Sequence, residues 1–385
     1  MELKRLFGIG CACLFMMSGC AGSNNSGEDA GKVAQEEAGT TPVEQSGEQA
    51  QADGSKDAKQ AQADGGQDAK QEGEAVTSIK TNGGNEIALS ALAHQRADAE
   101  SVVYFIPEIS AEALVKAYRA MGWTPKGKVG VKMSTGESEK SNHLRPALIK
   151  DLIQSINGTI VECNTAYGGN RATTEKHLKV IEERGFRDVA DVDILDADGS
   201  ISLPVDGKNL KEDLVGAHFK NYDSFLVLSH FKGHAMGGFG GAIKNISIGF
   251  GSSEGKLWIH SAGRSKTEWL SDKQDEFLES MAEAGKAVSD AMDHGKNIAY
   301  VSVMNRLSVD CDCDGNPAEP DMHDIGILAS TDALAIDQAG IDIVYASPDK
   351  DSLVARIERQ NGLHTLEHAE KMGLGHREYK LVVVK

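Results

Sequence analysis

Two histidines and a lysine in a glycine-rich stretch are the residues of this chain best suited to chemistry. His230 and His234 precede Lys244, and His260 follows the lysine by sixteen positions. Imidazole groups are general bases or metal ligands near neutral pH, and a desolvated lysine is a nucleophile or a covalent attachment point. A histidine taken alone is more often structural, so the prediction rests on the grouping. We expect these four side chains to contribute to one functional site.

Glycines and basic residues surround this group. Five glycines fall within nine positions, which are Gly233, Gly237, Gly238, Gly240 and Gly241. Glycine is kept where the backbone takes positive φ or approaches a ligand closely. Residues 226–266 contain five lysines and arginines and one acid, although the whole chain carries a net charge of −18. This basic island predicts an anionic small ligand, a carboxylate or a phosphate, with a flexible surface loop as the alternative.

Three cysteines form a second candidate group, Cys163, Cys311 and Cys313. Thiolates ligate metals and iron–sulfur clusters, so these three residues are candidate metal ligands. One residue separates Cys311 from Cys313, and outside the cytoplasm such a pair can equally form a strained disulfide. Metal ligation, a disulfide and inert thiols are therefore three open alternatives.

A polar segment at residues 164–171 directly follows an apolar run at 159–163. In parallel α/β sheets, ligands bind beyond the carboxyl ends of the strands. Asn170 and Arg171 are therefore candidate ligand-binding residues, with Arg171 as a fork for a carboxylate. An ordinary turn followed by a helix cap is the alternative.

The N-terminus has the pattern of an exported, lipid-anchored protein. Two basic residues precede an apolar run at 6–17, which is too short to span a bilayer but suits a signal-peptide core. The small residues before Cys20 resemble the bacterial lipoprotein processing site. This predicts a signal peptide at residues 1–20, lipidation of Cys20 and a location on the extracytoplasmic face of the cell membrane. An ordinary cleaved signal peptide with an incidental cysteine is the alternative.

The composition beyond this region bounds the domain organisation. Residues 21–80 contain no aromatic residue, and the segment 51–60 is nearly repeated at 62–71. Such a polar segment cannot bury enough apolar surface to fold, so we predict a disordered acidic stalk at residues 21–85. The net charge of −18 argues against a nucleic-acid partner, because phosphate contacts need a broad basic face.

Strand and helix patterns alternate through the remaining chain. Apolar runs predict strands at 102–105, 128–132, 159–163, 223–229, 298–304, 325–328 and 379–384. Helical periodicity lies between them, with Ser110 and Ser271 as expected N-caps. This predicts an α/β fold with a mostly parallel sheet and helices on both faces. We expect a main α/β domain at 86–295, a smaller second α/β lobe at 296–385 and a cleft between them.

The glycine-rich segment resembles an uncharacterised prokaryotic family, the domain-of-unknown-function 362 family. The resemblance rests on His230-Phe231-Lys232-Gly233-His234 followed by Gly238-Phe239-Gly240-Gly241-Ala242-Ile243-Lys244-Asn245. The stretches 161–167, 311–315 and 324–337 also resemble this family, and the match spans roughly residues 101–345. Many relatives carry a ferredoxin-like module with repeated C-x-x-C motifs. This sequence has no such motif, so the resemblance implies no electron transfer through that module.

A more distant resemblance is to the nickel-pincer lactate racemase family, on His234, Gly238-Phe239-Gly240-Gly241, Lys244 and His260. It implies a catalytic base at His234, a covalent cofactor on Lys244 and a nickel ligand at His260. Two features depart from that family. Asn170 stands where the racemase motif has a second catalytic histidine, and the signal peptide lacks the twin-arginine pair of proteins exported in the folded state.

We therefore predict a membrane-tethered protein that binds an anionic small molecule together with a metal (nickel or iron), a metal-linked cofactor or an iron–sulfur cluster. The expected chemistry is proton abstraction next to a carboxylate, and a non-catalytic lipoprotein for uptake or sensing is the alternative. The predicted catalytic residues are His230, His234 and Lys244. The predicted ligand-binding residues are Asn170, Arg171, Gly238, Gly240, Gly241, Asn245 and Lys256, and the predicted metal ligands are Cys163, His260, Cys311 and Cys313.

Overall fold

The computed structural model describes residues 76–385. The predicted signal peptide, Cys20 and residues 21–75 of the predicted stalk lie outside the described residues. Strand β1 (Ser78–Lys80) pairs with β2 (Glu86–Ala88), so that Ile79 and Ile87 lie opposite each other and are buried. The folded chain therefore includes residues 78–85, which the sequence assigned to the stalk, because this hairpin buries two isoleucines that composition alone does not place. No helix in the described part is both long enough and apolar enough to cross a bilayer.

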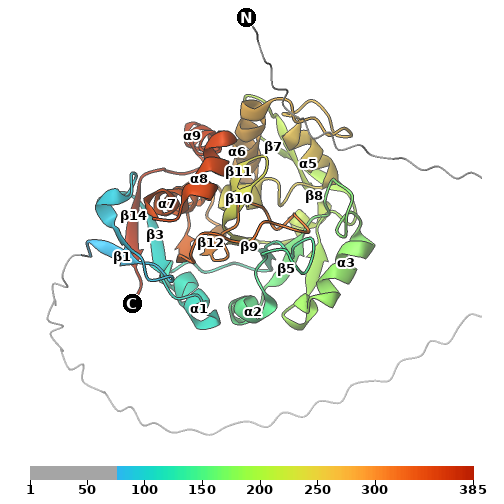
Figure 1. Cartoon of the computed structure of the whole chain (residues 1–385). Helices are drawn as coiled ribbons and strands as arrows, with labels where there is room; N and C mark the ends of the chain where they lie inside the picture. Colours follow the sequence, from blue (N-terminus) through green and yellow to red (C-terminus); the bar gives the residue numbers. More distant parts are fainter. Residues whose placement is uncertain (1–75) are drawn as a thin grey trace, which may run out of the picture. The chain divides into compact units, whose positions relative to one another are not determined.

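An eight-stranded sheet forms the centre of the fold (Figure 1). Its strands, in spatial order, are β14 (Tyr379–Val383), β3 (Ser101–Ile106), β13 (Gly326–Ser330), β12 (Ile298–Met304), β9 (Ser224–His230), β4 (Val129–Lys132), β5 (Thr159–Glu162) and β6 (Val192–Ile194). Strand β13 runs antiparallel to both of its neighbours, and the other neighbouring pairs are parallel. The predicted α/β fold with a mostly parallel sheet is confirmed.

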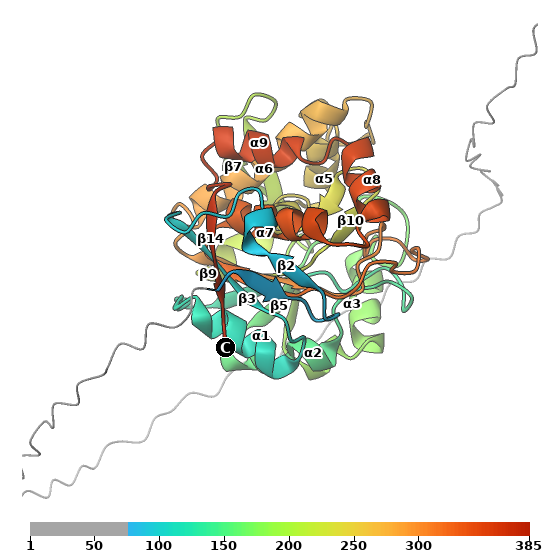
Figure 2. The ribbon, with the colours of Figure 1, turned by 60° about the vertical axis from the view of Figure 1, so that its left-hand side comes forward.

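Helices cover both faces of this sheet (Figures 1 and 2). One face carries α1 (Ala111–Ala120), α2 (Pro146–Ser155) and α3 (Thr174–Glu183). The other carries α4 (Ala242–Ile246), α5 (Ser253–His260), α6 (Gln274–Ala291), α7 (Ala333–Ala346), α8 (Asp351–Arg359) and α9 (His364–Lys371). Strand β9 shows why its sequence is apolar throughout: Leu226 faces the first layer and Val227 the second, so neither face meets water.

The strands of the expected smaller lobe belong to this same sheet. Strand β12 pairs with β9, and β14 pairs with β3 at the sheet's edge. The structure therefore places residues 298–383 differently from the predicted division at residue 296. Pairing between strands that are distant in the sequence decides this arrangement, and local hydrophobic patterns do not encode it.

Smaller elements lie outside the eight-stranded sheet. Two hairpins, β7 (Ser200–Pro204) with β8 (Glu212–Gly216) and β10 (Lys232–His234) with β11 (Gly238–Gly240), form separate two-stranded sheets. Short 3-10 helices are η1 (Leu89–Ala91), η2 (Phe186–Asp188) and η3 (Ala217–Asn221).

Helix caps were only partly predictable. The Ser110 hydroxyl accepts a hydrogen bond from the Ala113 amide at 3.1 Å, which confirms that cap. The cap expected at Ser271 is wrong, because α6 begins at Gln274 with Lys273 in the N-cap position and no side-chain hydrogen bond there.

The β10–β11 hairpin contains a glycine whose close packing makes a test of the fold. A Cβ atom at Gly233 would lie 2.3 Å from the backbone oxygen of Val309, whereas one at Gly168 would meet nothing within 4 Å. We expect Gly233→Ala to lower the free energy of unfolding by about 1–3 kcal/mol, because backbone must move to admit the methyl group. Gly168→Ala is the control and should change it by less than about 0.5 kcal/mol. Urea unfolding measures both, and equal effects would contradict this packing.

Candidate functional site

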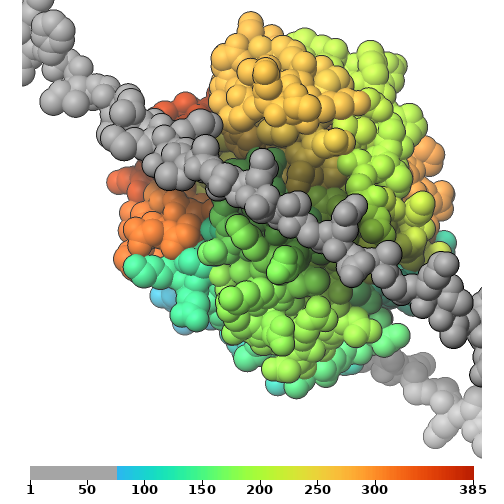
Figure 3. Space-filling model, turned by 90° about the vertical axis from the view of Figure 1, so that its right-hand side faces the viewer, coloured from blue at the N-terminus to red at the C-terminus, as the bar shows by residue number. Residues whose placement is uncertain are grey.

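A cavity of about 240 Å³, here called the central cavity, lies where the strands β4, β5 and β9 end at their carboxyl side. Its lining includes most of the predicted site residues: Cys163, Arg171, His230, His234, Gly240, Gly241, Lys244, Asn245, Lys256, His260, Cys311 and Cys313. Figure 3 shows a hollow on one face of the molecule, between its golden, green and orange segments. Two exposed aromatic residues, Tyr167 and Trp269, also line the cavity.

Helix α4 positions Lys244 and Asn245 at this cavity. The carboxylate of Asp337, on α7, accepts hydrogen bonds from the Ala242 and Ile243 amides at 2.6 and 2.9 Å. This interaction fixes the start of the short helix, and burial raises the pKa of Asp337 to about 7. A Cβ atom at Gly241 would lie 2.2 Å from the Asp337 carboxylate, so the glycine is what lets the carboxylate approach.

The ring of His234 is held in one tautomer. Its Nδ1 accepts hydrogen bonds from the Gly237 amide at 2.8 Å and the Met236 amide at 3.3 Å. Because both partners are donors, the neutral ring carries its proton on Nε2. Burial, together with Lys244, lowers the pKa of His234 and keeps the ring neutral. In this arrangement His234 offers the cavity a hydrogen-bond donor.

Two thiols lie beside this histidine. Ligand atoms of His234, Cys311 and Cys313 all lie within 4.8 Å of one another, and the Lys244 Nζ is 3.8 Å from the Cys311 Sγ. The hydrogen bond from the Cys313 thiol lowers the pKa of Cys311 well below its usual value, and Lys244 lowers it further against the effect of burial. Both cysteines are free thiols in the structure. The site thus places a thiol of lowered pKa next to the Lys244 amine and an imidazole N–H.

Asp312 connects the cysteine segment to the glycine-rich hairpin. Its buried carboxylate lies 2.8 Å from His230 Nδ1 and 3.1 Å from Lys232 Nζ. The other ring nitrogen of His230 lies 2.6 Å from the Asn305 carbonyl oxygen, so both nitrogens face acceptors. His230 therefore has no free nitrogen for a ligand, and its geometry favours a structural role over the predicted catalytic one.

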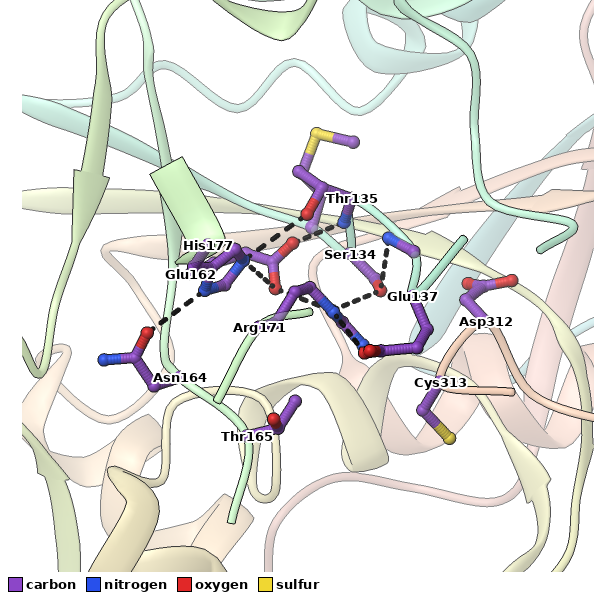
Figure 4. A network of polar contacts seen from close by, with 12 residues as sticks. Ser134, Thr135, Glu137, Glu162, Asn164, Thr165, Arg171, His177, Asp312 and Cys313 are labelled. Atoms are coloured by element: carbon purple, nitrogen blue, oxygen red, sulfur yellow. Dashed lines mark hydrogen bonds and ion pairs between the residues drawn. The ribbon is translucent and has the colours of Figure 1, made fainter. Parts of the chain in front are cut away.

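Arg171 is similarly occupied. Figure 4 shows it between two carboxylates, and its guanidinium lies 3.2 Å from each of Glu137 and Glu162. Although burial acts to raise it, the pKa of Glu162 is held well below its usual range by His177 and Arg171. The fork predicted to bind a ligand carboxylate is thus filled by the protein's own acids, and Arg171 instead fixes the cavity wall.

The hydrogen bonding of His260 leaves one ring nitrogen free to bind a metal. Its Nδ1 donates a hydrogen bond to the Lys256 carbonyl oxygen at 2.6 Å, which leaves Nε2 with a free lone pair. The ring stacks on Phe277 with centroids 4.7 Å apart, and burial lowers its pKa to about 3. A neutral imidazole with this tautomer is the form that binds metals, so the residue fits the predicted ligand role.

The remaining predicted residues separate from the central group. The thiol of Cys163 lies 3.2 Å from the Phe250 carbonyl oxygen, and burial raises its pKa to about 12, which disfavours the thiolate. Asn170 and Gly238 do not line the cavity: the Asn170 amide donates to Glu137, and Gly238 packs against Gly362. These two predicted ligand-binding residues are therefore placed outside the site.

Comparison with known proteins finds a family match over the segment that forms this cavity. The model of the family described as Domain of unknown function (DUF362) matches residues 129–342. The chain belongs to this family. The matched DUF362 segment runs from β4 to α7 and contains every residue that lines the central cavity. A comparison with curated proteins finds no match.

Two solved structures share a remote likeness with this DUF362 protein. A protein from Thermotoga maritima is 11% identical with a TM-score of 0.36, and the match covers 68% of this chain and 58% of that one. The lactate racemase apoprotein from Thermoanaerobacterium thermosaccharolyticum is 14% identical with a TM-score of 0.38, covering 70% of this chain and 62% of that one. This chain therefore spans about three fifths of the length of either structure.

Sequence reasoning missed two charged residues of the site, Lys132 and Glu162. Both are buried at the last position of a parallel strand. Lys132 donates to the Asn245 side chain at 3.1 Å, and burial lowers its pKa to about 8. The sequence signal that could have identified these two residues is a charge at the end of an apolar run. Such a charge is buried together with its strand, and a buried charge must be paired or face a polar cavity.

The Glu162–Arg171 pair yields a test of this wall. We expect Glu162→Gln to lower the free energy of unfolding by about 3 kcal/mol, because Arg171 loses one of its two buried partners. Glu183→Gln removes an exposed partner of Lys179, 3.7 Å away, and should cost less than about 0.5 kcal/mol. Urea unfolding at neutral pH compares the two variants. A loss at Glu162 no larger than at Glu183 would contradict the role assigned to this pair.

Proposed function

We propose that this DUF362 protein binds a small anionic molecule in the central cavity. It does so at the outer face of the cell membrane, to which a lipid on Cys20 tethers it. The observation that carries the proposal is the charge of the lining: four lysines and Arg171 face one acid, Glu162. That acid is already paired with Arg171. The cavity thus holds an excess of positive charge that an anion would compensate.

Three of the lysines have no carboxylate as ion-pair partner in the described part of the chain. Lys132 and Lys256 donate to backbone carbonyl oxygens at 2.8 and 2.5 Å, and Lys244 approaches only the Cys311 sulfur. Within residues 76–385, no carboxylate forms an ion pair with any of the three. Lys232 differs, because Asp312 neutralises it. Lys132 and Lys256 are buried and Lys244 is partly buried. Since ammonium groups are costly to bury without a counterion, these three amines support an anionic ligand.

A metal-linked ligand also fits this cavity. Lys244 and His260, the residues that the racemase resemblance implicates, line the same cavity, and the Nε2 of His260 is free to ligate. A metal held there would act as a Lewis acid toward the bound anion. His260 would hold the metal, and the lysines would orient the anion beside it.

Proton abstraction next to a carboxylate is the catalytic extension of this proposal. It requires an unprotonated nitrogen of His234 to face the substrate. The backbone amides of Met236 and Gly237 occupy Nδ1, so the nitrogen left for the cavity carries a proton. This hydrogen bonding supports ligand binding, with His234 as a donor to the anion, more than it supports a base.

Lys244 provides the direct test of anion binding. We expect the full chain to bind small dicarboxylates or inorganic phosphate by isothermal titration calorimetry. Lys244→Met should weaken that binding by at least about 10-fold, because a desolvated charge contact is lost. Lys179→Met, at an exposed surface lysine, is the matched control and should leave affinity unchanged. Equal affinity in the two variants, or no anion binding by the unaltered chain, would refute the proposal.

The pH dependence of binding gives a second test. Burial lowers the pKa of Lys132 to about 8, so the amine is charged below that pH and loses its proton as the pH rises through it. Anion affinity should therefore fall between about pH 7 and pH 9.5. Lys132→Met should remove this fall and leave weak affinity at every pH. An affinity that stays constant over this range in the unaltered chain would contradict the assigned role of Lys132.

A further inference from the structure

Two thiol side chains lie close together in the central cavity. Cys311 and Cys313 both line it, and the two cysteine sulfurs lie within 4.8 Å of each other. We call Cys311 and Cys313 the sulfur corner. Thiolates and thioethers are soft ligands, which bind Cu(I) in preference to hard cations such as Mg²⁺ or Ca²⁺. Two adjacent thiols therefore point to a soft ion rather than to the anion that the lysines suit.

The orientation of His234 distinguishes between soft metals. A zinc site built on two cysteines needs a nitrogen ligand, and that nitrogen must carry a lone pair. The Met236 and Gly237 amides donate to Nδ1 at 3.3 and 2.8 Å, so the other ring nitrogen carries the proton. The imidazole can thus donate to a sulfur but supplies no ligand atom in this arrangement. Two thiolates suffice for a monovalent ion but leave Zn²⁺ short of its usual four ligands.

The charge around the sulfur corner also favours Cu(I) over Zn²⁺. Two thiolates and one Cu(I) ion have a combined charge of −1, whereas two thiolates and Zn²⁺ are neutral. Lys244 Nζ lies 3.8 Å from the Cys311 sulfur, and no carboxylate in the described part of the chain neutralises this amine. An ammonium group at this distance stabilises an anionic complex and gives a neutral one no such advantage.

We propose that Cys311 and Cys313 bind one Cu(I) ion as thiolates, with Lys244 as the balancing charge. Two Cu–S bonds form, any proton on either sulfur leaves to solvent, and copper remains monovalent. The sulfur ligands are separate from Lys132 and Lys256, and Lys244 is shared with the proposed anion site. Loss of Cu(I) in the cysteine variants and loss of anion binding in the lysine variants are therefore measured separately.

Competition for Cu(I) tests the proposal. The full chain is titrated anaerobically with Cu(I) alone against a chromophoric Cu(I) chelator, in a background of Cys11→Ser and Cys13→Ser. That background removes a second C-x-C pair in the sequence. We expect one Cu(I) equivalent per chain. The double variant Cys311→Ser, Cys313→Ser should lose this equivalent, with Cu(I) affinity at least about 100-fold weaker. Removing the direct ligands of a metal lowers its affinity more than removing residues that only contact those ligands.

Cys163→Ser is the matched control, since Cys163 also lines the cavity but hydrogen-bonds to Phe250. It should keep the Cu(I) equivalent. X-ray absorption at the copper edge, on protein with Cys311 and Cys313 intact, should show a first shell of sulfur alone. That spectrum tests the copper ligands even if the cysteine variants fail to fold. Three results would overturn the proposal: Cu(I) retained by the double variant, nitrogen or oxygen in the first shell, or tighter binding of Zn²⁺ alone at these cysteines. A Cys311–Cys313 disulfide in protein purified without reductant would overturn it as well.

Discussion

Buried positive charge is the constraint on which this structure depends. Five cationic side chains line the central cavity, and a charge that leaves water without a partner costs several kcal/mol, of the order that would unfold a marginal domain. The protein compensates two of them with its own acids, Arg171 with Glu162 and Lys232 with Asp312. Lys132, Lys244 and Lys256 have no carboxylate partner in the described part of the chain, and Lys244 has only the Cys311 sulfur nearby. The cavity therefore keeps an excess of positive charge that the protein's own carboxylates do not neutralise.

The internal ion pairs also place the reactive groups. Asp312 lies between Cys311 and Cys313, and its carboxylate is bound to His230 and Lys232 of the glycine-rich segment. This pairing holds the two thiols near His234, although they lie some eighty residues away along the chain. Asp337 does the same for α4, since it binds the amides at the helix start and thereby fixes Lys244. Two buried carboxylates thus bring together groups from three separate segments.

The sequence predicted the local features of the site and missed the nonlocal ones. Residues 298–304 form a strand within the expected bounds, because a continuous apolar run has few alternatives in a buried sheet. The convergence of His234, Lys244 and His260 on one cavity also followed from their grouping. The membership of β12 and β14 in the main sheet did not, since strand pairing depends on contacts across the chain. Asn170 and Arg171 looked available for a ligand because Glu137, their partner, lies over thirty residues earlier.

The central claim is that an anionic guest completes the charge of the cavity. A crystal structure of the full chain with inorganic phosphate or a small dicarboxylate measures this most directly. The account predicts electron density for the anion inside the cavity, in contact with at least two of the amines of Lys132, Lys244 and Lys256. Density for the anion only on the outer surface, with these three amines turned away from the cavity, would contradict it.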